Sequence, residues 1–156
     1  MAAKKAKAPP LLRTGAKAGL RVLVLSGPNL QLLGTREPEI YGRETLADIH
    51  ERLVARGKEL GAQVTARQSN HEGQLCDWIG EAGGAFEGIL LNGAAYTHTS
   101  LALFDALKAV GLPCVEVHIS NPEAREAYRH TSRIAPACIA KVSGFEIGRA
   151  SCRERV

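Results

Sequence analysis

The chain has 156 residues, 45% of them hydrophobic and 23% charged, which is enough for one soluble domain with a substantial core. No apolar run approaches the ~20 residues of a membrane span, and Leu11-Leu12 is too short for the core of a signal peptide. The composition therefore argues against a membrane protein, and we expect a cytoplasmic one.

The basic charge is concentrated at the two ends of the chain. Residues 1–20 carry +5 and residues 147–156 carry +2, so a total of +4 leaves −3 for residues 21–146. This mildly acidic body argues against a nucleic-acid-binding protein, the class that a pI near 9.0 would suggest. Residues 1–20 are rich in Ala, Lys, Pro and Gly without an amphipathic pattern, which predicts a disordered basic extension.

The cysteines show no metal-binding pattern, because they form no Cys-x-x-Cys pair and no cluster with histidines at ligand spacing. Three of them fall in or beside periodic apolar segments. We predict reduced thiols, and neither a metal site nor disulfides, for Cys76, Cys114, Cys138 and Cys152.

From Arg21 onward, short apolar strands alternate with helical segments. The predicted elements, in chain order, are a strand over 21–26, a long loop over 27–44, a helix from Thr45 that ends at Gly61, a strand over 62–67, a helix over 72–82, a strand over 88–92, a helix over 100–110, and strands over 113–117 and 137–142. Thr45 can cap its helix together with Asp48, three residues later. This alternation predicts an α/β fold with a doubly wound parallel sheet and helices on both faces.

Polar residues suited to proton chemistry follow three of these strands. The first strand leads into Gly27-Pro28-Asn29, the third into the segment from Asn92 to His98, and the fourth into His118-Ile119-Ser120. Because the carboxyl ends of parallel strands open onto one crevice, we expect the active site there.

The first of these loops, 27–44, has no periodic pattern of its own and carries Arg36 and Tyr41. Loops this long in compact domains are usually lids, binding loops or disordered segments, and we favour a functional lid. The alternatives are that Gly27-Pro28-Asn29 is a simple turn and that Tyr41 is an anchoring aromatic.

The fourth strand carries a pair of groups typical of acid–base catalysis. Glu116 and His118 are two residues apart on a strand, so their side chains share a face of the sheet. Burying a pair of charged groups in a sheet covered on both faces costs free energy, so such a pair indicates a functional role. A carboxylate that fixes an imidazole is a common arrangement for a catalytic acid or base. The backbone N–H groups of Ile119-Ser120 and the guanidinium groups of Arg125 and Arg129 suit a carboxylate ligand.

The histidines elsewhere have alternative interpretations. Asn92 and His98 precede a helix whose N-terminus favours an anion or a polar ligand, but Ser100 could simply cap that helix beside a solvated His98. We interpret His50 as a helix-surface residue, His71 as a structural residue near a helix start, and His130 as a residue at the crevice rim.

Four segments in a fixed order form a more specific pattern. They are Gly27-Pro28-Asn29-Leu30-x-Leu-Leu-Gly34-x-Arg36 with Tyr41-Gly42, Ser69-Asn70-His71-Glu72-Gly73, Asn92-x-x-Ala95-Tyr96-Thr97-His98-Thr99-Ser100, and Glu116-Val117-His118-Ile119-Ser120-Asn121. Over roughly residues 21–145, the chain resembles the type II 3-dehydroquinate dehydratases. The resemblance implies a flavodoxin-like five-stranded sheet in the order 2-1-3-4-5, a dodecamer built from trimers, and neither a metal nor an organic cofactor.

The resemblance also implies the reaction, which is anti elimination of water from 3-dehydroquinate through an enolate to give 3-dehydroshikimate. Tyr41 would be the base that removes the proton α to the ketone, and Arg36 and Arg125 would favour its ionised form. An ordinary tyrosine, with a pKa of about 10, is only about 0.1% ionised at pH 7. Lowering its pKa to about 7 requires about 4 kcal/mol of stabilisation of the phenolate. One or two guanidinium groups can supply that. The reaction would serve either the shikimate pathway, toward chorismate and the aromatic amino acids, or quinate breakdown.

Further roles follow from the same resemblance. Asn29 would hold a water molecule that stabilises the enolate oxygen, and His118, oriented by Glu116, would protonate the departing hydroxyl. The remaining residues would bind the substrate: its carboxylate on Asn92 and the backbone N–H groups of Ile119 and Ser120, its ring hydroxyls on His98 and Arg129, and a neighbouring subunit's substrate on Asp105.

The alternative is a flavodoxin-like ligand- or phosphate-binding module without catalysis, since a fold does not fix a function. Such a module would end its first strand in a Ser/Thr-rich phosphate loop or an acidic pair. Ser26-Gly27-Pro28-Asn29 is neither.

The resemblance stops after Gly144, where the family continues into a final helix. Ile147-Gly-Arg-Ala-Ser-Cys-Arg-Glu-Arg-Val156 is the peptide that the string ATC GGA AGA GCG TCG TGT AGG GAA AGA GTG would encode. That string resembles a widely used short-read sequencing adapter whose next three bases, TAG, are a stop codon. We therefore predict a family domain over 21–146 with its final helix missing, and a non-native tail over 147–156 in which Cys152 has no function. Resequencing the locus through the codon for Gly144 checks this, and finding the same ten codons in genomic DNA would contradict it.

Overall fold

The computed structural model describes residues 19–35 and 44–144. Five strands form one parallel sheet in the order β2-β1-β3-β4-β5. Their bounds are Leu20–Ser26 for β1, Ala62–Gln68 for β2, Gly88–Asn92 for β3, Cys114–His118 for β4 and Ala140–Ser143 for β5. The predicted flavodoxin-like sheet is confirmed.

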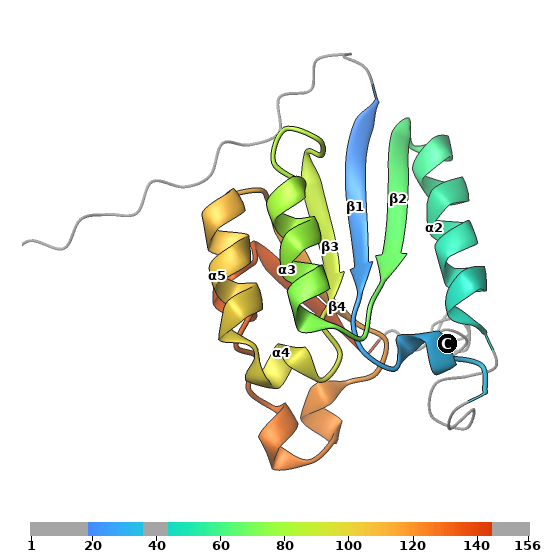
Figure 1. The fold of residues 1–156 in the computed structure, drawn as a ribbon. Coiled ribbons are helices and arrows are strands. Elements are labelled where there is room, and N and C mark those ends of the chain that lie inside the picture. The colour runs from blue at the N-terminus through green and yellow to red at the C-terminus, as the bar shows by residue number, and fades with distance from the viewer. Residues whose placement is uncertain (1–18, 36–43, 145–156) are drawn as a thin grey trace, which may run out of the picture.

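Helices connect these strands as the alternating pattern predicts, except that a short additional helix precedes the one expected over 100–110. They are α2 (Leu46–Glu59), α3 (Glu72–Glu81), the short α4 (Tyr96–Thr99) and α5 (Leu101–Val110). Helices α3 and α5 lie side by side over the sheet, while α2 packs beside β2 (Figure 1). The predicted cap of α2 is present, because Thr45 Oγ1 accepts the Asp48 N–H at 3.2 Å and Asp48 Oδ2 accepts the Thr45 N–H at 2.9 Å.

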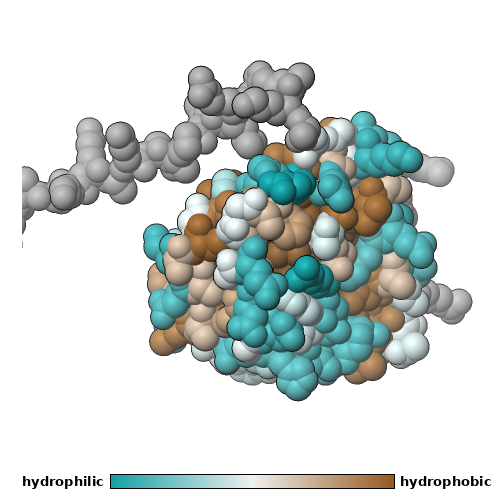
Figure 2. Space-filling model, turned by 45° about the horizontal axis from the view of Figure 1, so that its top comes forward, coloured by the Kyte–Doolittle hydropathy of each residue, from teal (hydrophilic) through white to brown (hydrophobic). Residues whose placement is uncertain are grey.

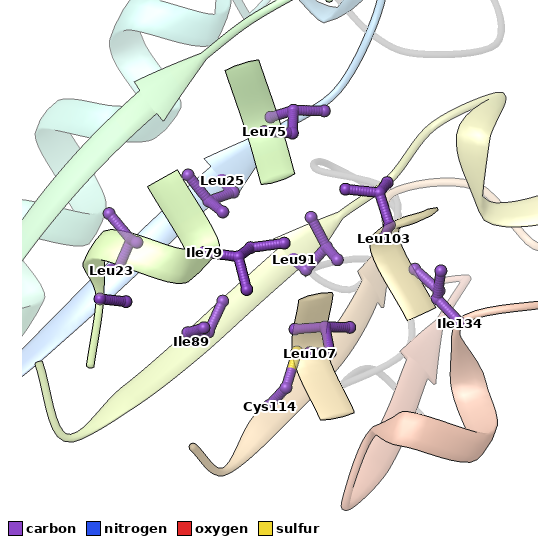
Figure 3. Packing of buried hydrophobic residues seen from close by; sticks show 11 residues of the cluster. Leu23, Leu25, Leu75, Ile79, Ile89, Leu91, Leu103, Leu107, Cys114 and Ile134 are labelled. Carbon is purple, nitrogen blue, oxygen red and sulfur yellow. The ribbon is translucent and has the colours of Figure 1, made fainter. Parts of the chain in front are cut away.

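The hydrophobic core fills the space between the sheet and the pair α3 and α5 (Figure 3). Residues 23–26 are all buried, as expected for a central parallel strand covered on both faces. Ten buried side chains of this cluster come from the two central strands, β4, the two helices and the turn before β5; they are Leu23, Leu25, Leu75, Ile79, Ile89, Leu91, Leu103, Leu107, Cys114 and Ile134. This packing fixes the strands whose carboxyl ends form the site described below.

The predicted fifth strand, 137–142, is wrong at its start. Residues 135–137 form a 3-10 turn, and β5 begins only at Ala140. Pro136 has no N–H to give to a sheet, and the N–H groups of Ala137 and Cys138 donate within the turn, to Ile134 O and Ala135 O at 2.9 Å each. The turn therefore uses the backbone donors that a longer strand would need.

Several sequence predictions fall outside the described residues. They concern residues 1–18 of the predicted disordered extension, the segment with Arg36 and Tyr41, and the chain after Gly144, for which we predicted a missing final helix and a non-native tail over 147–156. Among the described residues, no helix is both long and apolar enough to cross a membrane. Figure 2 shows the end of the molecule at which β1 begins, where hydrophobic residues are interspersed with hydrophilic ones.

Candidate active site

A hollow of about 170 Å³ lies at the carboxyl ends of β1, β3 and β4. The loops that follow these three strands line it, as the crevice rule for parallel sheets leads one to expect. Eight of the predicted site residues line the hollow: Asn29, Asn92, His98, His118, Ile119, Ser120, Arg125 and Arg129. The sheet therefore brings together side chains that are up to 100 positions apart in the sequence.

Four predicted site residues are placed differently. Glu116 lies behind His118, with no exposed surface. Asp105 is exposed on α5 and does not line the hollow. Arg36 and Tyr41 lie outside the described residues.

The hollow is lined by two residues with unusual backbones. Asn29 has a φ of 66° and Ala94 a φ of 48°, and they are the non-glycine residues with positive φ in the described part of the chain. Left-handed backbone is costly for residues with a Cβ and persists where the surroundings hold it in place. Its occurrence at two points of one hollow marks this region as a candidate functional site.

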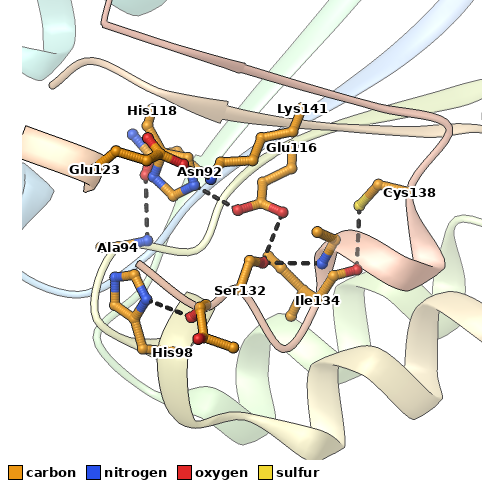
Figure 4. Close-up of polar contacts among 12 residues, drawn as sticks. Asn92, Ala94, His98, Glu116, His118, Glu123, Ser132, Ile134, Cys138 and Lys141 are labelled. Atoms are coloured by element: carbon orange, nitrogen blue, oxygen red, sulfur yellow. Dashed lines mark hydrogen bonds and ion pairs between the residues drawn. The ribbon is translucent and has the colours of Figure 1, made fainter. Parts of the chain in front are cut away.

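The centre of the site is a chain of three polar side chains, those of His118, Glu116 and Ser132, of which Glu116 is fully buried (Figure 4). Glu116 Oε1 lies 2.5 Å from His118 Nε2, and Glu116 Oε2 accepts the Ser132 hydroxyl at 2.8 Å. Ser132 Oγ in turn accepts the Ala135 N–H at 2.9 Å. Both carboxylate oxygens are thus hydrogen-bonded, which a fully buried carboxylate requires.

This arrangement determines which nitrogen of the His118 imidazole can interact with a ligand. The carboxylate of Glu116 is an acceptor, so His118 Nε2 carries the hydrogen and is occupied by that bond. Nδ1 is the nitrogen left for chemistry, as a proton acceptor in the neutral ring and as a donor in the charged ring. The pair can therefore hold or release one proton at the edge of the hollow.

The polar groups around this pair are also oriented by local bonds. Asn92 Oδ1 accepts the Ala94 N–H at 3.2 Å, which leaves its amide NH₂ to donate toward a ligand. His98 Nδ1 is 2.9 Å from the Thr131 carbonyl oxygen, so Nε2 is its remaining nitrogen. The hollow thus presents a donor amide and an imidazole nitrogen that accepts in the neutral ring and donates in the charged ring, groups that can bind the hydroxyl and carboxylate oxygens of a ligand.

The two arginines stand at the rim, on the segment after β4. Glu126 Oε2 accepts from Arg129 Nε at 2.9 Å and lies 3.6 Å from Arg125 Nε. The Arg129 guanidinium also lies over the Tyr128 ring, 5.2 Å from its centroid. These contacts hold positive charge beside the hollow.

No three His, Cys, Asp or Glu side chains in the described residues group in a way that could hold a metal ion.

The family model described as dehydroquinase class II matches residues 20–151 of the chain. The chain belongs to this family. A relative from Ralstonia nicotianae, named 3-dehydroquinate dehydratase 2, is 56% identical over 131 residues, which cover 81% of this chain and 85% of the relative. A 3-dehydroquinate dehydratase from Phenylobacterium zucineum is 56% identical over 124 residues, covering 80% and 86%.

Solved structures agree with this result. The type II dehydroquinase from Butyrivibrio crossotus has a TM-score of 0.82 at 38% identity, covering 88% of this chain and 97% of that one. The one from Propionibacterium acnes has a TM-score of 0.78 at 41% identity, covering 83% and 89%. The family and the fold predicted from four short segments are both confirmed, while the roles of the individual residues stay predictions.

The structure of this dehydroquinase shows contacts that the sequence interpretation missed. His50 is not a helix-surface residue, because it is partly buried with Nε2 3.2 Å from Ser26 Oγ, and burial lowers the pKa of its imidazole. Ser132 was not among the predicted site residues, although it holds Glu116. It lies in a non-periodic segment, and no sequence signal marks it. Asn70 lies in one of the four signature segments, but the sequence analysis assigned it no role.

The predicted roles of two other histidines, a structural one for His71 and a place at the rim for His130, stay predictions, since His71 makes no side-chain capping bond and His130 does not line the hollow. His71 is exposed at the start of α3, and His130 is exposed with Nε2 2.9 Å from the Arg125 carbonyl oxygen.

Proposed function

We propose that this chain dehydrates 3-dehydroquinate to 3-dehydroshikimate in the hollow at the carboxyl ends of β1, β3 and β4. The observation that carries the proposal is the buried Glu116–His118 pair at the edge of that hollow, in a chain of the dehydroquinase family. The product is a conjugated enone, so its absorbance gives a direct assay with the purified protein. Absence of that absorbance change with 3-dehydroquinate would contradict the proposal.

The elimination begins with loss of a proton α to the ketone. Tyr41, as a phenolate, takes this proton, and the C–H electron pair moves into the carbonyl to form an enolate. Arg36 and Arg125 favour the phenolate because a nearby positive charge stabilises the ionised form. Support for this step comes from the signature segment that carries Arg36 and Tyr41, and from Arg125 at the rim of the hollow.

The second half of the reaction expels the hydroxyl. The enolate re-forms the ketone, the new C=C bond forms, and the C–O bond breaks as His118 Nδ1 donates its proton, so that water leaves. Glu116 stabilises the charged imidazole before the transfer. Asn29 binds the water molecule that donates a hydrogen bond to the enolate oxygen, where negative charge develops.

Substrate binding uses the remaining polar lining. The amide of Asn92 and the backbone N–H groups of Ile119 and Ser120 hold the carboxylate, and His98 and Arg129 bind ring hydroxyls. The orientation of Asn92, whose Oδ1 is already taken by the Ala94 N–H, supports a donor role.

Assembly and cellular context complete the proposal. The protein is cytoplasmic and forms a dodecamer built from trimers, in which Asp105 reaches a neighbouring subunit's site. The exposure of Asp105 and of Leu101, 64% exposed on the same helix, is compatible with such a contact. The reaction serves aromatic biosynthesis through the shikimate pathway or the breakdown of quinate.

Chelators and borohydride are expected to leave activity intact. No metal enters the proposed steps, and none of the four signature segments contains a lysine for a Schiff base. The measurement is the initial rate after incubation with EDTA, and separately after incubation with borohydride plus substrate, compared with borohydride alone. Inactivation that requires both borohydride and substrate would reveal a Schiff base and refute the enolate mechanism.

Ser132→Ala is expected to lower kcat by about 10-fold or more, because a hydrogen bond to a charged group contributes about 1.5–3 kcal/mol and its loss leaves Glu116 Oε2 unpaired. Ser132→Thr keeps the hydroxyl and is expected to retain most of the activity. Steady-state kinetics and a thermal unfolding curve for both variants check this. Equal kcat for the alanine and threonine variants would show that the hydroxyl does not act on Glu116.

A further inference from the structure

Asn70 connects the three loops around the carboxyl ends of β1, β2 and β3. Its Oδ1 accepts the backbone N–H of Asn29 at 2.9 Å and the side-chain amide of Gln68 at 3.0 Å. Its carbonyl oxygen accepts the Tyr96 hydroxyl at 2.8 Å. Asn70 itself does not line the hollow, so any effect on the reaction must pass through its partners.

Asn29 is the partner that lines the hollow, and its backbone is left-handed, with φ 66° and ψ −1°. Asparagine tolerates this conformation better than most residues, yet it still prefers others. The bond from Asn29 N–H to Asn70 Oδ1 crosses from the loop after β1 to the loop after β2, strands that run side by side (Figure 1). It therefore restrains the turn from outside the hollow.

The acceptor is itself held from two directions. Gln68, at the end of β2, donates its amide to Asn70 Oδ1 and also to Gln31 Oε1 at 3.1 Å. Tyr96, whose ring packs against the hydrophobic core, anchors the Asn70 backbone through its hydroxyl. An acceptor fixed in this way can hold Asn29 in one position relative to the segment after β3, which carries Asn92 and His98.

We propose that Asn70 is a positioning residue, whose side-chain oxygen holds Asn29 in the left-handed conformation that directs its side chain to the water molecule at the enolate oxygen. This inference rests on the proposed function, in which Asn29 stabilises the enolate through a water molecule. A group that acts only when negative charge develops changes kcat more than KM. Asn70 should therefore affect the chemical step although it does not touch the substrate.

The test uses the full chain and three replacements of exposed residues. Asn70→Ala removes the acceptor and is expected to lower kcat about 10-fold with KM changed less than about twofold, in line with the loss of one ordering hydrogen bond. Asn70→Asp keeps oxygens that accept both N–H groups and is expected to retain kcat within about threefold. Gln31→Ala is the matched control, because it removes a neighbouring bond of Gln68 and leaves the Asn29 bond intact.

A double-mutant cycle distinguishes this inference from the proposed function. If Asn70 acts through Asn29, then Asn70→Ala added to Asn29→Ala should lower kcat by less than about twofold further. An unchanged kcat for Asn29→Ala alone would refute the proposed role of Asn29. A lowered kcat for Asn29→Ala combined with an unchanged kcat for Asn70→Ala would refute only the positioning role. Equal losses for Asn70→Ala and Asn70→Asp, or for Gln31→Ala, would also refute it.

Discussion

His118→Ala is expected to lower kcat by about 10²–10⁴-fold, the usual effect of removing a general acid. The hydroxyl group of 3-dehydroquinate is a poor leaving group unless it is protonated as the C–O bond breaks. His118 is placed for this by Glu116, which occupies Nε2 at 2.5 Å and leaves Nδ1 for the substrate. Steady-state kinetics over a range of pH is the measurement.

Two further variants make this experiment specific. His71→Ala is the control, since His71 is exposed at the start of α3 and lies outside the hollow, and its kcat should stay within about twofold. Glu116→Gln replaces the carboxylate beside the imidazole with a neutral amide, so kcat is expected to fall although His118 itself is unchanged. A His118→Ala enzyme with near-normal kcat would show that another group protonates the leaving hydroxyl.

Tyr41→Phe is expected to lower kcat by at least about 10²-fold, because phenylalanine keeps the ring but has no oxygen to take the α proton. Arg36→Lys should also be damaging, since a single ammonium on a flexible stem does not replace a planar guanidinium beside a phenolate. The same enone assay checks both variants, and binding of the product measured separately shows whether the site is still formed.

Tyr128→Phe serves as the matched control for the loss of a phenol. Tyr128 is 66% exposed and does not line the hollow, and phenylalanine retains the ring that faces the Arg129 guanidinium. Its kcat should change less than about twofold. Substantial activity in Tyr41→Phe together with intact binding would mean that a different residue removes the proton.

The fold was predictable from the sequence because its signals are local and repeated. Apolar runs alternate with helical segments, and a cap such as the one between Thr45 and Asp48 is complete within three positions. A parallel sheet then follows, because a helical segment between two strands returns the chain to the same end of the sheet. Convergence at the carboxyl ends of the strands follows as well, which is why eight of the predicted site residues line one hollow.

The remaining contacts depend on tertiary structure. The start of β5 moved because a turn around Pro136 takes up its backbone donors. The bonds of Ser132 to Glu116, of His50 to Ser26 and of Asn70 to Asn29 join residues 16, 24 and 41 positions apart.

By itself, the sequence determined the family, and through that resemblance the order of the sheet, as well as which loops meet. Only the tertiary structure decided which nitrogen of His118 is free, which hydroxyl holds Glu116 and which amide holds Asn29. The physical reason is that a hydrogen bond requires a donor and an acceptor within about 3 Å and in line. No periodicity along the chain encodes that relation between segments brought together only by packing.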